Sequence, residues 1–467
     1  MSPLGHLGLT KSRRRRGSMT RIKYVAMLAL AIGLVGCGDD DGTDPGTDSG
    51  TPGEDGGTMM MDDAGETGGD TIVDVAVANG SFTTLVGALE STGLDEALAG
   101  DGPFTVFAPT DDAFEALGVD LSTLSTEELT TILQYHVVAG EVPSTAIPAT
   151  ADTLADLTLV FDTSDGVVVN DASVVMADVE ASNGVIHVID TVLLPPDIPT
   201  MAGYAGLSSL AGALGDAELV EALQAEGPFT VFAPTNDAFG ELEAVPTGDA
   251  LASVLLYHVV SGTIAAEDIP TDGAAFVDTL SENEGGNGIT LVATAAGGSA
   301  TINGAGVAVA DVKCTNGVVH VIDAVLLPPN IVDMVGIAGL TELGDAVGAA
   351  ADIDADTSVA DALAGDGPLT VFAPTNAAFE DISETVAGLS AEQVRDVLLY
   401  HVVDGAVLST DLADGDVETL LGQDVTIDTA GPTVDGAASD PSNIVVTDIN
   451  LTNGVVHVID TVLIPTL

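Results

Sequence analysis

The sequence predicts three α+β domains in tandem, and three observations support this fold class. Three blocks recur in the same order, namely a VFAPT block, a Tyr-His-Val-Val block and a closing block of the type NGVVHVID. The prolines of VFAPT fall at 109, 234 and 374, intervals of 125 and 140 residues. This spacing suits self-sufficient domains rather than the short units of a solenoid. Within each copy, helical and strand periodicities mix without regular βαβ alternation, which indicates α+β.

Charge divides the 467 residues into two parts. Residues 1–36 hold seven of the nine Lys and Arg residues and no acid, whereas from Cys37 onward 72 acids face only Lys313 and Arg395, a formal charge of −70. Such a surface repels phosphates and excludes nucleic acid as a partner. Its self-repulsion favours a monomer. Adaptation to salt is one explanation of this charge, and binding of divalent cations is the other.

The amino-terminal segment is predicted to be a lipoprotein signal peptide over residues 1–36, of which 1–18 are a misassigned extension of a start at Met19. A basic stretch precedes an apolar run that is too short to span a bilayer. The run ends in Leu-Val-Gly-Cys, which resembles a bacterial lipobox, so Cys37 is the predicted lipid attachment site and the membrane a partner through that lipid. Gly38 follows, not Asp, and by resemblance to enterobacterial sorting this favours the outer membrane, facing the surface or the periplasm.

Residues 37–70 are rich in Asp, Gly, Thr and Pro and nearly free of apolar side chains. Such a segment is predicted to be a disordered acidic linker. The domains are then predicted at 71–197, 198–330 and 331–467.

The first copy can be read element by element. Val73, Val75 and Val77 alternate as in a strand, and helical spacing follows. Thr105–Phe107 is a short buried strand, after which Thr110 is predicted to cap a helix, and Thr235 and Thr375 repeat this cap in the other copies. Further signals are a capping box at Ser125 and Glu128, repeated at Ser390 and Gln393, a half-made cap at Thr247, and an Asn-Gly turn before the last strand at 183–184, 316–317 and 453–454.

These blocks, in this order and spacing, resemble the fasciclin-domain family over about residues 70–467. The resemblance implies three tandem fasciclin-like domains, each a β-wedge or sandwich with packed helices. It also implies an extracellular role in cell adhesion or matrix attachment.

Six of the seven histidines lie in the repeats, within apolar runs. A neutral imidazole there is predicted to hydrogen-bond the backbone, and no repeated Ser, Cys or Lys supplies a nucleophile. We therefore expect no enzyme and no cofactor. No EF-hand order of ligands occurs, so no metal site is predicted. Unrepeated Cys314 occupies an apolar slot and is read as a small buried hydrophobe. A His-x-x-Asp motif of structural character recurs at His187 and Asp190, His320 and Asp323, and His457 and Asp460.

In animal matrix relatives, an Asp-Ile dipeptide before the closing block and the Tyr-His region are implicated in integrin binding. By resemblance, the candidate adhesion residues are Asp178, Val179, Asp311, Val312, Asp448 and Ile449, together with Tyr135, His136, Tyr257, His258, Tyr400 and His401. The alternative is an Asp at a strand edge, solvated while its neighbour packs inward.

The sequence thus predicts a lipid-anchored bacterial surface protein that attaches to an unknown cell-surface, matrix or polysaccharide ligand. The alternative is a non-catalytic acidic spacer or a cation-dependent surface coat protein.

Overall fold

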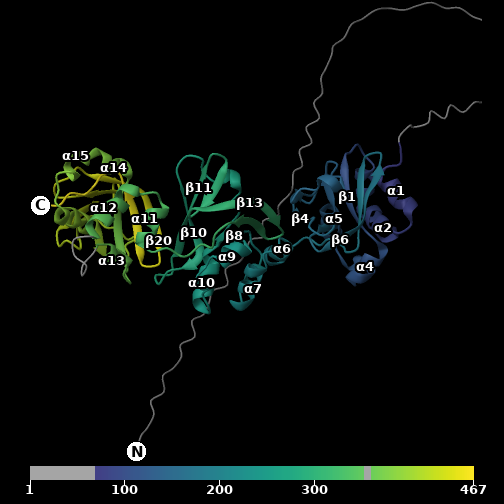
Figure 1. The fold of residues 1–467 in the computed structure, drawn as a ribbon, viewed down its shortest axis with the longest axis horizontal. Helices are drawn as coiled ribbons and strands as arrows, with labels where there is room; N and C mark the ends of the chain where they lie inside the picture. The colour runs from purple at the N-terminus through teal and green to yellow at the C-terminus, as the bar shows by residue number, and fades with distance from the viewer. Residues whose placement is uncertain (1–68, 352–358) are drawn as a thin grey trace, which may run out of the picture. The chain divides into compact units, whose positions relative to one another are not determined.

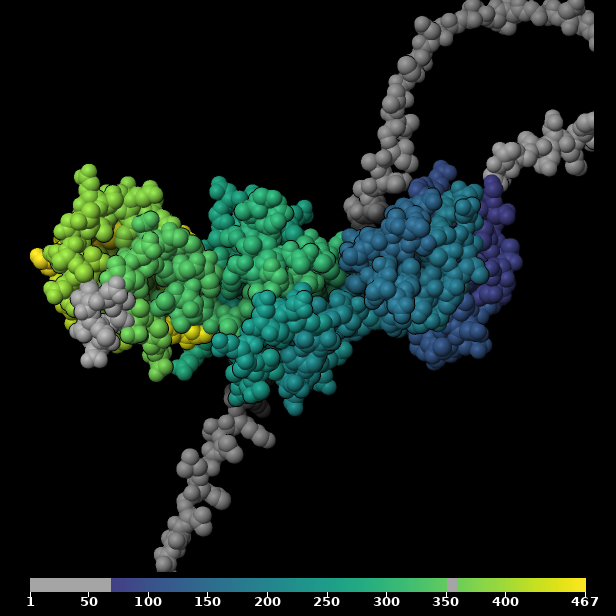
Figure 2. Space-filling view, in the orientation of Figure 1, coloured from purple at the N-terminus to yellow at the C-terminus, as the bar shows by residue number. Residues whose placement is uncertain are grey.

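The computed structural model describes residues 69–351 and 359–467. The predicted signal peptide, Cys37 and most of the predicted linker lie outside these residues. Each repeat forms its own seven-stranded mixed sheet with packed helices (Figure 1). Each repeat has its own apolar clusters, whose members come almost entirely from that repeat. Figure 2 shows the described residues in space-filling form, coloured by position along the chain. The predicted fold class, three α+β domains in tandem, is confirmed.

The first domain contains five α-helices and two short 3₁₀ helices: α1 Ile72–Asn79, α2 Thr83–Thr92, α3 Leu94–Leu98, α4 Asp111–Leu117, α5 Thr126–Tyr135, η1 Leu121–Thr123 and η2 Ser144–Ala146. Its strands are β1 Phe104–Pro109, β2 Val137–Ala139, β3 Thr150–Asp152, β4 Thr158–Asp162, β5 Val168–Val169, β6 Ala172–Ala181 and β7 Gly184–Ile189.

The second domain repeats this order. Its helices are α6 Ile198–Tyr204, α7 Ser208–Asp216, α8 Val220–Leu223, α9 Asn236–Gly240, α10 Asp249–Tyr257 and η3 Ala266–Asp268. Its strands are β8 Phe229–Pro234, β9 Val259–Ser261, β10 Ala275–Glu282, β11 Gly288–Ala296, β12 Ser299–Ile302, β13 Ala305–Cys314 and β14 Gly317–Ile322.

The third domain has the helices α11 Ile331–Ile337, α12 Thr341–Ala351, α13 Val359–Ala364, α14 Asn376–Asp381, α15 Ser383–Val386 and α16 Ala391–Tyr400. Its strands are β15 Leu369–Pro374, β16 Val402–Asp404, β17 Gly415–Glu418, β18 Asp424–Asp428, β19 Thr433–Asp435, β20 Ser442–Leu451 and β21 Gly454–Ile459.

The strand order of the first sheet is β2-β1-β7-β6-β5-β4-β3, and the other two sheets follow the same plan. The pairing of β1 with β7 is parallel, whereas the other pairs are antiparallel. The VFAPT block and the closing block are therefore the second and third strands of each sheet and pair with each other, although about eighty residues separate them in the first repeat.

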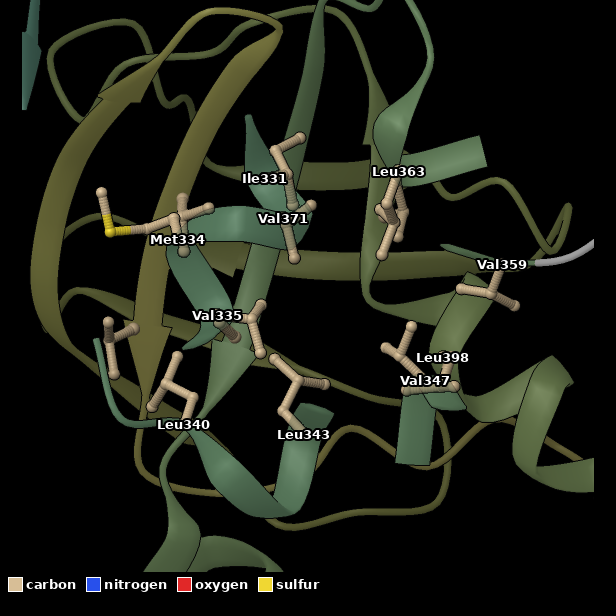
Figure 3. Close-up of a cluster of buried hydrophobic side chains, with 14 of the residues drawn as sticks. Ile331, Met334, Val335, Leu340, Leu343, Val347, Val359, Leu363, Val371 and Leu398 are labelled. Carbon is tan, nitrogen blue, oxygen red and sulfur yellow. The ribbon is translucent and has the colours of Figure 1, made fainter. Parts of the chain in front are cut away.

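The paired strands β1 and β7 are buried on both faces of the sheet, and the same holds for their equivalents in the other domains. Their alternate residues enter two different apolar clusters. Val106 and Ala108 of β1 pack with the helices, and Phe107 packs on the other face with Leu159 and Val169. A strand that is buried on both faces must be apolar throughout, which explains the VFAPT block. Figure 3 shows the helix-side cluster of the third domain, where residues of α11, α12 and α13 meet Val371 of β15 and Leu398 of α16.

Helix starts follow the caps that the sequence predicts. Thr110, Thr235 and Thr375 each accept a hydrogen bond from the backbone three residues on, at 3.2 Å. Both predicted capping boxes form. The half-made cap at Thr247 does not, since α10 follows Gly248 without a side-chain cap.

The strand predicted from Val73, Val75 and Val77 is wrong, because these residues lie in α1. Thr71 and Asp74 form a capping box that closes the first helical turn and overrides the alternation. Among the described residues, no helix combines the length and apolar character needed to cross a bilayer.

Candidate functional site

The three tyrosines of the Tyr-His pairs are fully buried. Their hydroxyls donate to a backbone carbonyl on β4, β11 and β18 respectively, those of Thr158, Thr290 and Asp424, at 2.9, 2.9 and 2.6 Å. Burial raises the pKa of each phenol. In each folded domain the tyrosine therefore joins the helix before β2, β9 or β16 to strand β4, β11 or β18. Because its ring is buried, a partner at the surface does not reach it.

The histidines that follow are also buried, at most 3% exposed. One ring nitrogen bonds the carbonyl four residues back in its helix, and the other accepts a backbone N–H from the segment after the last strand. These pairs are Ile132 and Leu193 for His136, Val254 and Leu326 for His258, and Val397 and Leu463 for His401. Burial lowers the pKa of each to about 4, so the rings are neutral.

The second set of histidines connects to the candidate aspartates. His187 accepts the backbone N–H of Asp178 at Nδ1, 3.3 Å away, and its Nε2 bonds the carbonyl of Val142 at 2.8 Å. His320 and His457 make the same pair of bonds, to Asp311 and Ile264 and to Asp448 and Val407. Both ring nitrogens of all six histidines are thus bonded to backbone, which leaves none to act as a general base.

Each candidate aspartate lies at a β-bulge. The register of β6 against β7 shifts between Met176 and Val179, and Asp178 there has φ of 56°. Asp311 and Asp448 repeat the bulge with φ of 57° and 59°. Asp tolerates this left-handed conformation better than most residues, which gives a backbone reason for Asp at this place.

The carboxylates at these bulges bind the loop that follows strand β2, β9 or β16 of the same domain. Asp178 accepts from the backbone N–H of Ser144 at 2.8 Å and from the Ser144 hydroxyl. Asp448 makes the same two bonds to Ser409, and Asp311 accepts from Ala266 N–H at 2.9 Å. Asp178 is exposed, whereas Asp311 and Asp448 are half-buried. The hydrogen bond from the Ser144 side chain lowers the pKa of Asp178.

The residues after these aspartates differ in burial between repeats. Val179 is half-buried, whereas Val312 and Ile449 are 2% and 1% exposed. The inward-packing neighbour is thus present, but its aspartate is bonded to a loop instead of being free in solvent. Of the candidate adhesion set, the three aspartates and Val179 reach the surface, and the aspartates alone do so in every domain.

The His-x-x-Asp motif does not form a side-chain pair. Asp190 accepts from Ser173 N–H at 2.8 Å, Asp323 from Gly306 N–H at 2.7 Å and Asp460 from Asn443 N–H at 2.8 Å. Residues three apart in an extended segment point to opposite faces. Each aspartate therefore accepts its hydrogen bond at the start of the neighbouring strand, while its histidine stays in the core. Cys314 is 7% exposed, and burial raises the pKa of its thiol to about 12.

The asparagine of each Asn-Gly pair has a role beyond the turn that the sequence predicts. Asn183 Oδ1 accepts from Ile72 N–H at 2.9 Å, and its Nδ2 donates to the carbonyls of Leu98 and Gly100. Asn316 and Asn453 repeat this set of bonds. The asparagines therefore fix the first helices of each domain to the sheet. The only sign of this role in the sequence is that the asparagine recurs in all three repeats. A tight turn explains an Asn-Gly pair equally well, so the recurrence does not point to these hydrogen bonds.

A groove of about 1030 Å³ lies where the first two domains meet, and six of its lining residues are acidic. They are Asp152, Asp156, Asp197, Glu226, Glu267 and Asp311, beside Lys313. Within residues 69–351 and 359–467, no three His, Cys, Asp or Glu side chains are grouped as a metal ion requires.

A fasciclin domain model matches residues 80–195, 205–328 and 348–465, and the chain belongs to the fasciclin-domain family. Protein sll1483 of Synechocystis sp. is 52% identical over 133 residues, 27% of this chain and 74% of that protein. Periostin of Homo sapiens is 31% identical over 370 residues, 74% of this chain. The cell surface glycolipoprotein MPB83 of Mycobacterium bovis is 39% identical over 137 residues, 27% of this chain and 61% of that protein. The chain spans 42% of the length of periostin.

Proposed function

We propose that this chain is a lipid-anchored bacterial surface protein that attaches cells to another cell, a matrix or a polysaccharide through its fasciclin domains. The observation that carries the proposal is the threefold fasciclin domain behind a lipobox-like Cys37. The likeness to the cell surface glycolipoprotein MPB83 supports both parts of the proposal. Three weak sites on one chain would act multivalently.

The use of the histidines supports a non-catalytic role. Catalysis needs a base with a free nitrogen near a nucleophile. All six repeat histidines give both nitrogens to the backbone, and the Cys314 thiol is buried. Binding through the surface is therefore the activity that this geometry supports best.

The bulge aspartates are the proposed contact points, since they recur in all three domains and reach the surface. Charge can be removed there without removing the fold, because Asn also tolerates the left-handed conformation and accepts the loop N–H. The test variant replaces all three, Asp178→Asn, Asp311→Asn and Asp448→Asn. The matched control, Glu90→Gln, Asp216→Asn and Glu384→Gln, removes one exposed charge from a helix of each domain.

The experiment compares cells without the protein with cells that carry the unaltered chain, Cys37→Ala or either triple variant. Lipid labelling and fractionation are expected to place the unaltered chain with membranes and to release Cys37→Ala. Adhesion is expected to fall in the null and released strains and in the aspartate variant, but not in the control. If null cells adhere normally, the adhesive function is wrong. If only the aspartate variant adheres normally, the function stands and the contact points lie elsewhere.

The acidic spacer or coat remains the second candidate, supported by the formal charge of −70 after residue 36 and by the acidic groove. A spacer predicts unchanged adhesion in the null strain.

A further inference from the structure

The two junctions between successive domains share one arrangement. Strand β4 of the first domain contacts β13 of the second, and β11 of the second contacts β20 of the third. At each junction a buried threonine hydroxyl accepts a backbone N–H from the next domain. Thr158 accepts from Lys313 at 2.9 Å, and Thr290 accepts from Asn450 at 3.0 Å. Each hydroxyl donates in turn to an acid on the neighbouring strand of its own domain, Asp152 or Asp278, at 2.9 and 2.8 Å.

A valine two residues after each threonine completes the contact. Val160 packs against the apolar cluster of the second domain, which includes Val312 and Cys314 of β13. Val292 is 2% exposed and belongs to the cluster of the third domain. We call the Thr-x-Val segments of β4 and β11, and the equivalent residues 424–426 of β18, the docking face. Residues 313 and 450, with the equivalent residue 180 of β6, mark the receiving face.

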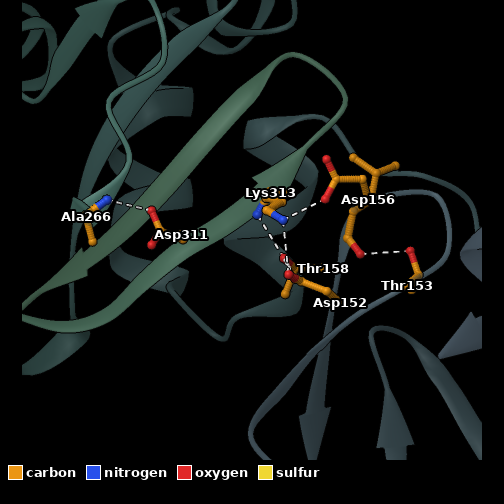
Figure 4. A network of polar contacts seen from close by, with 8 residues as sticks. Asp152, Thr153, Asp156, Thr158, Ala266, Asp311 and Lys313 are labelled. Carbon is orange, nitrogen blue, oxygen red and sulfur yellow. Dashed lines mark hydrogen bonds and ion pairs between the residues drawn. The ribbon is translucent and has the colours of Figure 1, made fainter. Parts of the chain in front are cut away.

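Lys313 adds an ion pair to the first junction. Its ammonium lies 3.1 Å from an Asp152 oxygen and 2.6 Å from an Asp156 oxygen (Figure 4). These carboxylates raise the pKa of Lys313 and keep it charged. The pair is partly exposed, so salt weakens it.

The two outer faces lack these features. On β18, Asp424 stands where the inner docking faces have Thr, and Thr426 stands where they have Val. Asp424 lies opposite Glu418, and all three side chains are exposed. On the other outer face Glu180, also exposed, stands where Lys313 and Asn450 stand.

We propose that the junction is one repeated docking interaction and that the acids of the two outer faces prevent it from forming between molecules. A head-to-tail interface that does not close into a ring continues into a filament unless its ends are blocked. Docking of the third domain onto the first domain of another copy would bring Asp424 and Glu418 against Glu180. It would also replace an apolar contact by the hydroxyl of Thr426. Like charges brought together in this way disfavour the contact.

The first test restores the inner residues at the outer faces of the full chain, with Glu180→Lys, Asp424→Thr and Thr426→Val. The control, Glu90→Lys, Asp216→Thr and Thr126→Val, makes the same changes at exposed helix positions. Sedimentation velocity over a concentration series, with circular dichroism to check folding, is expected to show head-to-tail association in the first variant only. Its dimer fraction should exceed that of the control by about tenfold or more. Equal sedimentation of both variants at every concentration overturns the proposal.

The second test places the residues of the outer docking face at the first junction, with the substitutions Thr158→Asp and Val160→Thr. Amide hydrogen exchange at Lys313 is expected to accelerate, because a carboxylate at position 158 cannot donate to Asp152 as the hydroxyl does, the two acids repel each other, and the junction opens. The Asn450 amide, in the unaltered second junction of the same molecule, should keep its rate. Unchanged protection at Lys313 overturns the proposal.

Discussion

At the scale of single residues, the repeated histidines are cross-links between backbone segments. His258 joins the end of α10 to the segment after β14, two parts of the chain that are 68 residues apart. The bond depends on a neutral ring, because the nitrogen that accepts the Leu326 N–H has to be unprotonated. These histidines therefore link stability to pH.

We expect stability to fall as the pH drops from 6.5 towards 4. Burial lowers the pKa of His258 from 6.5 to about 4, so the unfolded chain takes up a proton first and is favoured in this window. The loss is on the order of 3 kcal/mol per buried histidine. Replacement by Gln, which cannot titrate, should cost stability at pH 7 and reduce the pH dependence. Urea unfolding of the unaltered chain and His258→Gln at pH 7 and pH 4.5 measures the difference, and parallel curves would contradict the expectation.

The bulge aspartates give a second prediction. Asp448→Ala removes the acceptor of the Ser409 N–H and places Ala at φ of 59°. The expected loss is roughly 1–3 kcal/mol in the unfolding of the third domain. Asp448→Asn keeps the conformation and one acceptor and should lose less than about half of that amount. Denaturant unfolding of both variants checks this order, and equal losses would show that the backbone conformation is unimportant.

At the scale of elements, the closing strand depends on a close approach between backbones. A Cβ built on Gly317 would lie 2.0 Å from the carbonyl oxygen of Phe229 on the parallel strand β8, and Gly317 has φ of 154°. Gly184 and Gly454 meet the same obstruction in their own domains. The glycine is therefore needed for pairing of the two central strands, and not only for the turn.

We expect Gly317→Ala to destabilise the second domain by roughly 3 kcal/mol or more, since backbone atoms cannot yield as a side chain would. Gly212→Ala in helix α7 of the same domain is the control, because nothing lies within 4 Å of its Cβ position. This control should gain roughly 0.5–1 kcal/mol, as Ala is the better helix former. Thermal melting of the two variants decides, and a shift of the same sign in both would contradict the close approach.

Local signals predicted the helix caps and the buried central strands, because Thr110 or the VFAPT block acts through its immediate neighbours. Local signals could not predict that the VFAPT strand pairs in parallel with the closing strand. The pairing of two strands that are far apart in the sequence is set by how the whole domain packs. The alternation of Val73 with Val75 misled because a cap two residues earlier decided the conformation. The domain junctions, like the hydrogen bonds of the asparagines, could not be predicted from local signals. Their partners, such as Thr158 and Lys313, are distant in sequence and meet only in the folded chain.

At the scale of the whole molecule, charge is the dominant feature. From Cys37 onward 72 acids face two bases, and both described ion-pair partners of Lys313 are acids of the preceding domain. Self-repulsion opposes compaction, and counterions relieve it without a specific site.

Added NaCl is therefore expected to raise the melting temperature. CaCl₂ at matched ionic strength should give nearly the same value, because the described residues hold no group of three metal ligands. Differential scanning calorimetry in the two salts measures this. A clearly higher midpoint in calcium would reveal specific binding and would favour the cation-dependent coat.

The distribution of docking and receiving faces also bears on how such a chain can lengthen in evolution. The second domain alone carries both a working receiving face at Lys313 and a working docking face at Thr290 and Val292. An in-frame duplication of its coding segment would create a new junction ready to form. Duplication of either terminal domain would set an acidic face inside the array. Longer descendants of this chain should therefore have grown from the middle.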